Sequence, residues 1–162
     1  MTDAETKDAL GQAIESVQHI SQQVQRLAAD PRLGMPVTPD TLRHLSDDDA
    51  ARLHGFLRLF EQLHQLVERR LFRGVLLLSY EDAAKMSVRN MTDRLETLGA
   101  IESSDQWREV GRIRNALAHD YPGNFELHAA RVNDSHAILA ELCSTAGAVI
   151  DYIAREHLLA AN

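Results

Sequence analysis

The chain has 162 residues, of which 44% are hydrophobic and 25% are charged, the usual balance of one globular domain with a core. Its 17 basic and 24 acidic residues give a net charge of −7, which opposes broad attraction to nucleic acid and restricts any such binding to a local site. A single cysteine excludes an intramolecular disulfide and a multi-cysteine metal site within the chain. The polar, acidic N-terminus and the short apolar runs predict a cytoplasmic protein that does not enter a membrane.

The first 45 residues are expected to form a helix and a connecting loop. Apolar residues recur there three, four or seven positions apart, as on one buried helical face, namely at Leu10, Ile14, Val17, Val24 and Leu27. Residues 31–40 hold three of the four prolines and show no periodicity, which indicates a proline-rich loop. The chain is therefore divided into residues 1–45 and a helical bundle over residues 46–162, within one compact domain.

Two further helices are predicted between residues 46 and 99. Ser46 precedes three aspartates, so its hydroxyl can cap a helix whose first turn is acidic. Gly74 marks a possible bend or end of that helix. Ser79 with Asp82 is expected to open the next helix, and Gly99 to close it in a left-handed conformation. The buried stripe of this second helix is expected to contain Val88, Met91, Leu95 and Leu98.

The remainder of the chain continues the helical pattern. Ser103 with Gln106 predicts a capping box, followed by apolar positions at Trp107, Val110, Ile113 and Leu117. Residues 125–158 predict a last helix, which residues 133–135 could interrupt. No stretch shows a sustained period of two, so strands are not expected. The predicted fold is all-α, an antiparallel, up-and-down bundle of four to five helices.

The most informative segment is RIRNALAHDYPGNFE, residues 112–126, at the end of the helix that begins near Ser103. Helical spacing places Arg112, Asn115 and His119 on the face opposite the apolar stripe, and Arg114 on the flank near the tryptophan. Tyr121 is expected to leave the helix, because the proline that follows it disfavours helical geometry.

These residue types fit RNA cleavage without a metal. An imidazole can transfer protons near neutral pH, and a guanidinium can hold a phosphate at two points. The ribose 2′-OH would then attack the neighbouring phosphorus and leave a 2′,3′-cyclic phosphate. Because this motif supplies one imidazole per chain, a two-fold dimer is expected to bring two sets together.

Arg114, Asn115 and His119 resemble the motif of HEPN-superfamily ribonucleases, in which a polar residue follows an arginine and a histidine comes four to six positions later. Tyr121, two residues after the histidine, matches the HepT-like toxins, and the likeness covers about residues 48–158. It implies Arg114 and His119 as catalytic residues, with Asn115 and Arg112 supporting them. It further implies a homodimer that cleaves RNA without a cofactor, as the toxin of a nucleotidyltransferase-paired (type VII) toxin–antitoxin system. The cognate minimal nucleotidyltransferase antitoxin would add AMP to Tyr121.

Simpler interpretations of these residues stay open. His119 could be a solvated histidine near a helix C-terminus, Arg114 could cover Trp107 with its stem, and Tyr121 could pack under the following turn. At the level of the whole chain, one alternative is a non-catalytic HEPN module that binds a nucleotidyltransferase, nucleotide or RNA. Another is a structural dimerisation domain.

The remaining histidines and a run of arginines suggest less specific chemistry. His54 and His64, and likewise His128 and His136, lack the spacing of a recognised zinc motif, so no metal site is predicted. A basic cluster could contact RNA or cover a helix end with its aliphatic stems, the latter being more common; it consists of Arg69, Arg70 and Arg73.

Overall fold

The computed structural model describes residues 2–79, 82–119 and 122–160, and every regular element within these ranges is helical. The prediction of an all-α chain is therefore confirmed. In chain order the α-helices are α1 (Asp3–Ala28), α2 (Pro39–Arg43), α3 (Asp47–Leu66), α4 (Arg73–Leu78), α5 (Val88–Leu98), α6 (Ser104–Leu117) and α7 (Phe125–Arg155). Three short elements join them, the 3₁₀ turns η1 (Pro31–Leu33) and η3 (Ala83–Lys85) and the π-helical segment η2 (Val67–Phe72).

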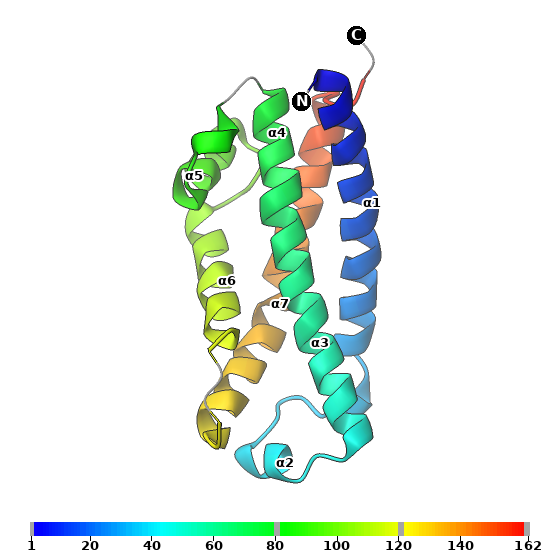
Figure 1. Ribbon diagram of the computed structural model, residues 1–162, viewed down its shortest axis with the longest axis vertical. Helices are drawn as coiled ribbons and strands as arrows, with labels where there is room; N and C mark the ends of the chain where they lie inside the picture. The colour runs from blue at the N-terminus through cyan, green and yellow to red at the C-terminus, as the bar shows by residue number, and fades with distance from the viewer. Residues whose placement is uncertain (1, 80–81, 120–121, 161–162) are drawn as a thin grey trace.

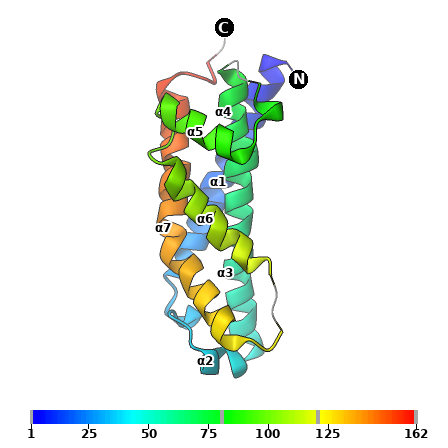
Figure 2. The ribbon, with the colours of Figure 1, turned by 90° about the vertical axis from the view of Figure 1, so that its left-hand side faces the viewer.

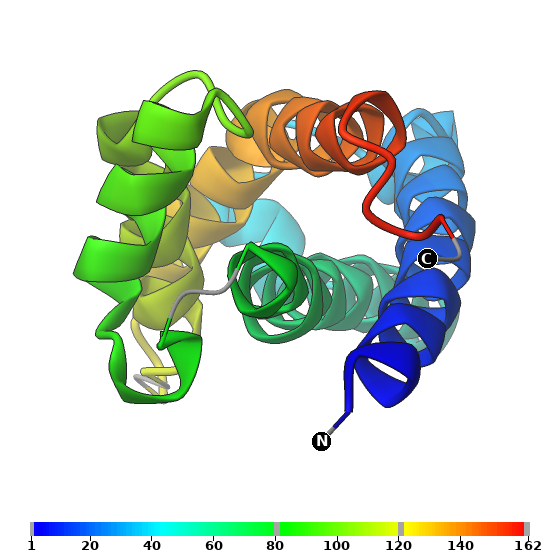
Figure 3. The same cartoon turned by 90° about the horizontal axis from the view of Figure 1, so that it is seen from above.

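The longer helices lie lengthwise along one axis (Figure 1). Seen from above, α3 with α4 and α7 occupy the middle, α1 lies on one side, and α5 with α6 lies on the other (Figure 3). Figure 2 shows that α5 lies across the long axis, whereas α6 runs obliquely over α3. The α5 and α6 pair therefore forms one flank of the molecule, on the opposite side from α1.

Hydroxyl caps begin several helices where the sequence predicts them. The Ser46 hydroxyl accepts a hydrogen bond from the Asp49 amide at 3.1 Å, and the Ser103 hydroxyl accepts one from the Gln106 amide at 3.1 Å. At the other end of α5, Gly99 has a φ of 76°, the left-handed geometry that glycine adopts without steric cost. The amide of the next residue, Ala100, donates to the Leu95 carbonyl at 2.9 Å and completes this helix end.

The predicted start of α5 was wrong by several residues. The Ser79 hydroxyl donates back to the Val75 carbonyl at 2.8 Å at the end of α4, and Asp82 makes no side-chain cap. The helix begins instead at Val88, where the Ser87 hydroxyl accepts from the Asn90 amide at 3.2 Å. Because Val88 is the first residue of its helix, its side chain is not packed into the core and is 41% exposed.

The helix that begins after Ser46 does not end near Gly74. It continues from α3 through the wider π-helical turns of η2 into α4. Gly74 instead allows α1 to approach, since a Cβ atom there would lie 2.9 Å from Leu10 Cδ1. The absence of a side chain at this position therefore sets the distance between α1 and α4.

The N-terminal segment contributes to the same hydrophobic core as the remaining helices. Leu10, Val17 and Val24 of α1 are buried with the apolar faces of α3, α6 and α7. The proline-rich loop is held to α7 by two hydrogen bonds, in which the Val37 amide donates to Asn133 Oδ1 at 2.8 Å and Asn133 Nδ2 donates to the Val37 carbonyl at 2.9 Å. Helix α7 itself runs through residues 133–135 without a break.

Helix α7 is long and apolar enough to cross a membrane by length and composition. The core helix of a globular protein passes the same test. Its most apolar 18-residue stretch is 33% buried inside the molecule, and its buried residues include Val132, Leu142 and Val149. The helix therefore contributes side chains to the core. Its composition alone does not show in which cellular compartment the protein lies.

Replacement of Gly74 by alanine is expected to lower the free energy of unfolding by about 1–2 kcal/mol, because the new methyl group must displace the buried Leu10 side chain. Gly147→Ala in α7 is the matched control. Nothing lies within 4 Å of a Cβ at that position, so alanine should raise the stability by about 0.5–1 kcal/mol through helix propensity. Urea unfolding of both variants measures the two effects. Equal stabilisation by both substitutions would contradict a close α1–α4 contact at Gly74.

Candidate functional site

Helix α6 is anchored through its tryptophan. Trp107 is 1% exposed, and its ring stacks on His64 of α3 with centroids 4.8 Å apart and planes at 8°. The indole and Phe72 pack edge to face at a centroid distance of 4.7 Å, and the indole N–H donates to Glu68 Oε2 at 3.1 Å. These contacts satisfy both the apolar ring and its polar N–H. Trp107 and Ile113 are buried as predicted, whereas Leu117 is only half-buried.

His64 is a buried imidazole without a hydrogen-bond partner among the described residues. It is 5% exposed, and neither ring nitrogen makes a hydrogen bond. The nearest carboxylate oxygen, Glu68 Oε2, lies 3.7 Å from Nε2 and already accepts from Trp107. Burial first, and the positive charge of Arg114 second, lower the pKa of His64 from 6.5 to about 4. The imidazole is therefore neutral at neutral pH.

Helices α5 and α6 are joined into one flank by polar contacts. The Ser104 amide donates to Glu96 Oε2 at 2.6 Å, and Arg108 Nη1 donates to Asp93 Oδ1 at 3.0 Å. The guanidinium of Arg108 also pairs with Asp105. Gly111 lies above His64, where a Cβ would be 3.7 Å from Nε2. These contacts fix the position of α5 relative to α6.

A groove of about 510 Å³ lies along this flank, between η2, α5 and α6. We call it the Arg114 groove. Its walls contain Arg69 of η2, Arg89 of α5 and three arginines of α6, with the His64 and Trp107 rings among its lining. The arginines and polar groups that line it are Arg69, Arg89, Arg108, Arg112, Arg114, Gln65, Glu68 and Asn115.

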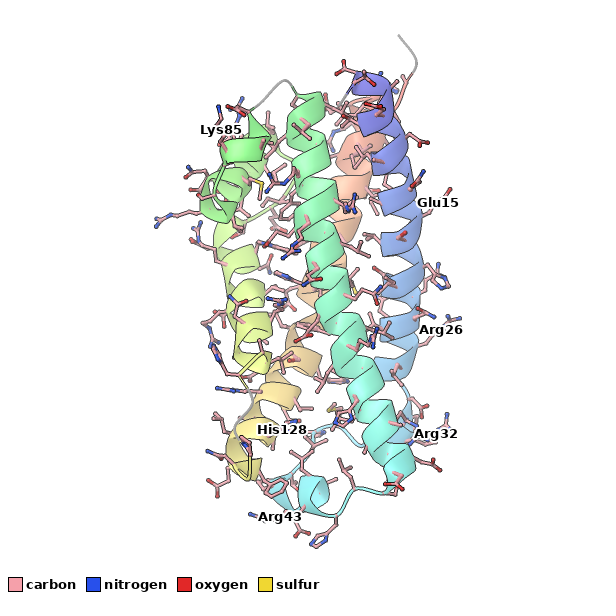
Figure 4. The ribbon with its side chains drawn as sticks, in the orientation of Figure 1. Glu15, Arg26, Arg32, Arg43, Lys85 and His128 are labelled. Carbon is pink, nitrogen blue, oxygen red and sulfur yellow. The ribbon has the colours of Figure 1, made fainter. Side chains whose placement is uncertain are left out.

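A second groove, of about 400 Å³, lies where α6 ends against α3 and the start of α7. We call it the His119 groove. It collects three imidazoles, those of His54, His119 and His128, together with the guanidinium groups of Arg58 and Arg131. Figure 4 shows His128 on α7 near the end of the molecule where that helix begins. Within the described part of the chain, no three side chains of the metal-binding types gather closely enough to hold an ion.

His119 is exposed and lies two residues beyond the end of α6. Its backbone carbonyl accepts a hydrogen bond from Arg131 Nη1 at 2.6 Å, which ties the end of α6 to α7. The imidazole is thereby held beside the groove while its ring stays accessible to solvent. A group in this position is reached from solvent without any part of the core opening.

The structure divides the sequence-predicted site residues between the two grooves. Arg112, Arg114 and Asn115 line the Arg114 groove, and His119 lines the other. Arg114 Nη1 donates to Asn115 Oδ1 at 3.1 Å, while Arg112 pairs with Glu109 through contacts of 2.9 and 2.6 Å. Tyr121 lies outside the described residues.

Sequence reasoning did not identify the imidazoles of His54, His64 and His128 as site residues, because each was weighed only as a metal ligand. A usable signal existed for His64, which lies four residues after Phe60 and three before Val67, on the edge of a buried helical stripe. No pattern along the chain places His54 or His128 beside His119. Their proximity arises from the packing of α3 against α7.

The buried neutral imidazole predicts a pH dependence of stability. Between about pH 6.5 and 4, the unfolded chain protonates His64 whereas the folded chain does not, so stability falls as the pH is lowered through this range. Relative to His64→Phe, which keeps a flat ring against Trp107, the wild type should lose on the order of 3 kcal/mol between pH 7 and pH 4. Urea unfolding across this range measures the difference in free energy of unfolding between the two proteins. The contributions of the other titrating groups are common to both and cancel in this difference. Parallel pH profiles for the two proteins would show that His64 is not buried as a neutral group.

Comparisons with protein-family models, curated protein sequences and solved structures give no match to this chain. The resemblance to HEPN ribonucleases therefore depends on the residues themselves. It consists of Arg114, Asn115, His119 and Tyr121 at their fixed spacing in an otherwise helical chain. Any function must be argued from these residues and from the two grooves.

Proposed function

We propose that this chain is a metal-independent endoribonuclease of the HepT-like HEPN type, folded as an antiparallel helical bundle and active as a cytoplasmic homodimer. A minimal nucleotidyltransferase would be its antitoxin partner, as in other toxin–antitoxin pairs of this type. The observation that carries the proposal is the His119 groove, where three imidazoles and two guanidinium groups line one accessible depression.

The groove contains the groups that phosphodiester transfer requires. One imidazole accepts the proton of the ribose 2′-OH while its oxygen bonds to phosphorus, and a second, protonated imidazole donates a proton to the departing 5′-oxygen. His119 is the first candidate, and His54 or His128 is available for the complementary step. Arg58 or Arg131 can stabilise the charge on the phosphoryl oxygens. The products are a 2′,3′-cyclic phosphate and a 5′-hydroxyl, and all protons are accounted for.

A dimer would add Arg114 to this chemistry. Within one chain, Arg114 lies on α6 and lines one groove, whereas His119 lies just beyond the end of α6 and lines the other. An isologous contact near α6 presents the same surface from both subunits, so it can place the Arg114 side chain of one copy beside the His119 side chain of the other. The separation of the two residues in a single subunit thus favours a composite site.

One observation favours the non-catalytic alternative. The Arg114 groove concentrates cationic groups away from the accessible imidazoles, an arrangement that suits binding of RNA or nucleotide without cleavage. Under this alternative the chain is a HEPN module that binds RNA, nucleotide or a nucleotidyltransferase.

Purified protein should cleave RNA in EDTA and leave cyclic phosphate ends. His119→Ala should abolish most of this activity, by about 10²-fold or more, because a proton-transfer group is lost. Arg114→Lys should also lower the rate, because lysine keeps the charge but not the two-point phosphate contact. His19→Ala on the exposed face of α1 is the matched control and should cleave like the wild type. Intact RNA after incubation with wild-type protein would exclude the nuclease and leave the binding module.

Tyr121 is the proposed control point, and its position two residues after His119 motivates the test. AMP added to its phenol would put a bulky nucleotide and a negative phosphate near the site and repel the RNA backbone. Tyr121→Phe should keep cleavage activity and resist neutralisation by the partner nucleotidyltransferase. Mass spectrometry after co-expression measures the modification. An unmodified Tyr121 in the neutralised wild type would rule this control out.

A further inference from the structure

We propose that the Arg114 groove is a phosphate-binding site in which Arg69, Arg89 and Arg114 hold the phosphate groups of a nucleotide or an RNA backbone. The site is separate from the His119 groove, and the proposal does not depend on cleavage. It goes beyond the proposed nuclease because it assigns Arg69 and Arg89, which lie outside the motif, as ligand-binding residues.

The first argument is the local charge. The whole chain has a net charge of −7, yet five of its 17 basic residues line this groove. Glu68 is the acidic residue among the groove-lining side chains, and its carboxylate accepts the Trp107 N–H. Five arginines along one concave surface of an acidic protein create a local attraction for anions that the net charge opposes elsewhere.

The second argument is that only some of these arginines are paired with carboxylates. Arg108 pairs with Asp93 and Asp105, and Arg112 pairs with Glu109. Across the part of the chain that the structure describes, Arg69, Arg89 and Arg114 form no ion pair with a carboxylate. Those three guanidinium groups are therefore not paired with a carboxylate of the described residues, and Arg114 donates through Nη1 only to the neutral amide oxygen of Asn115.

Arg114 supplies the third argument. Its Nε atom is buried and has no hydrogen-bond partner among the described residues. A buried charged donor without an acceptor is costly. Because Arg114 lines the groove, a small shift of its side chain toward an acceptor oxygen there would relieve that cost. Neutral His64 beside it adds no competing positive charge at neutral pH, since burial and Arg114 depress the pKa of its imidazole to about 4.

The three arginines come from three different elements, η2, α5 and α6. Arg89 is the second residue of α5, so the positive end of that helix dipole lies at the same groove. The π-helical turns of η2 carry Arg69 and Glu68, and such turns are frequent at functional sites. Guanidinium groups that approach from separate elements suit an anion with several oxygens, and phosphate is the common biological group of that kind.

The aromatic rings of the groove limit what else the ligand can contact. Trp107 is 1% exposed and its face is already covered by His64, so no nucleobase can stack on either ring. Recognition should therefore follow the phosphate and not the base. Both a free polyphosphate and the backbone of RNA meet this requirement, and the experiment must separate them.

Trp107 is the one tryptophan of the chain, and its position beneath the groove makes its fluorescence a reporter of binding. The full-length protein is titrated with pyrophosphate and, separately, with a short 2′-O-methyl RNA, which cannot undergo attack by its own 2′-oxygen. We expect saturable fluorescence changes whose affinity is the same for oligonucleotides of different base sequence. A tighter RNA response indicates a backbone track, whereas saturation by pyrophosphate alone indicates a small phosphorylated ligand.

Arg69→Gln and Arg89→Gln should each weaken binding about tenfold, as expected for loss of one charge-assisted contact. The matched control is Arg26→Gln, which removes the same charge from α1 on the side away from α5 and α6 (Figure 4). No saturable response to either probe, or an equal loss with Arg26→Gln, would overturn the site. Because the methylated RNA cannot be cleaved, this result is independent of whether the wild type cuts RNA.

Discussion

The packing of Trp107 against His64 and Phe72 is the contact on which the flank formed by α5 and α6 depends. It buries a large aromatic side chain of α6 against α3 and η2, and the indole N–H reaches Glu68 so that no polar atom of the ring is left unsatisfied. The position of α5 depends in turn on α6, because Glu96 and Asp93 of α5 accept hydrogen bonds from the start and the side of α6. The Arg114 groove has the Trp107 ring in its lining, whereas the His119 groove meets α6 only at the end of that helix.

This contact has an electrostatic consequence for His64. A histidine stacked on a buried indole cannot retain a proton at neutral pH, because burial disfavours the charged form and Arg114 repels it. The protein thereby keeps a neutral imidazole within a surface of arginines. Three exposed histidines, His54, His119 and His128, line the His119 groove instead. Helix α6 therefore lies between a neutral, buried imidazole and the exposed imidazoles of the His119 groove.

Much of the fold could be predicted because its determinants are local. The caps at Ser46 and Ser103 and the left-handed Gly99 are fixed by contacts within a few residues, and the periodic apolar positions identify the buried face of each helix. The start of α5 was wrong because Ser79 has two local options. Its hydroxyl completes the end of α4 by donating to Val75, so it does not cap a new helix. Gly74 was interpreted as a bend, although its function is to admit Leu10 from a helix more than 60 residues earlier in the chain.

The sequence by itself determined that the chain is helical, where α3, α6 and α7 begin and where α5 ends, and that Arg112, Arg114, Asn115 and His119 lie on or just beyond one helix. Only the tertiary structure decided that Arg114 and His119 open into different grooves, and which residues share each groove. Arg69 and Arg89 join Arg114, whereas His54 and His128 join His119. The physical reason is that a helical period specifies the direction of a side chain relative to its own axis. The partners it meets depend on how separate helices pack. In the His119 groove this is the packing of α3 against α7, and in the Arg114 groove it is the packing of α6 on α3 through Trp107 and His64.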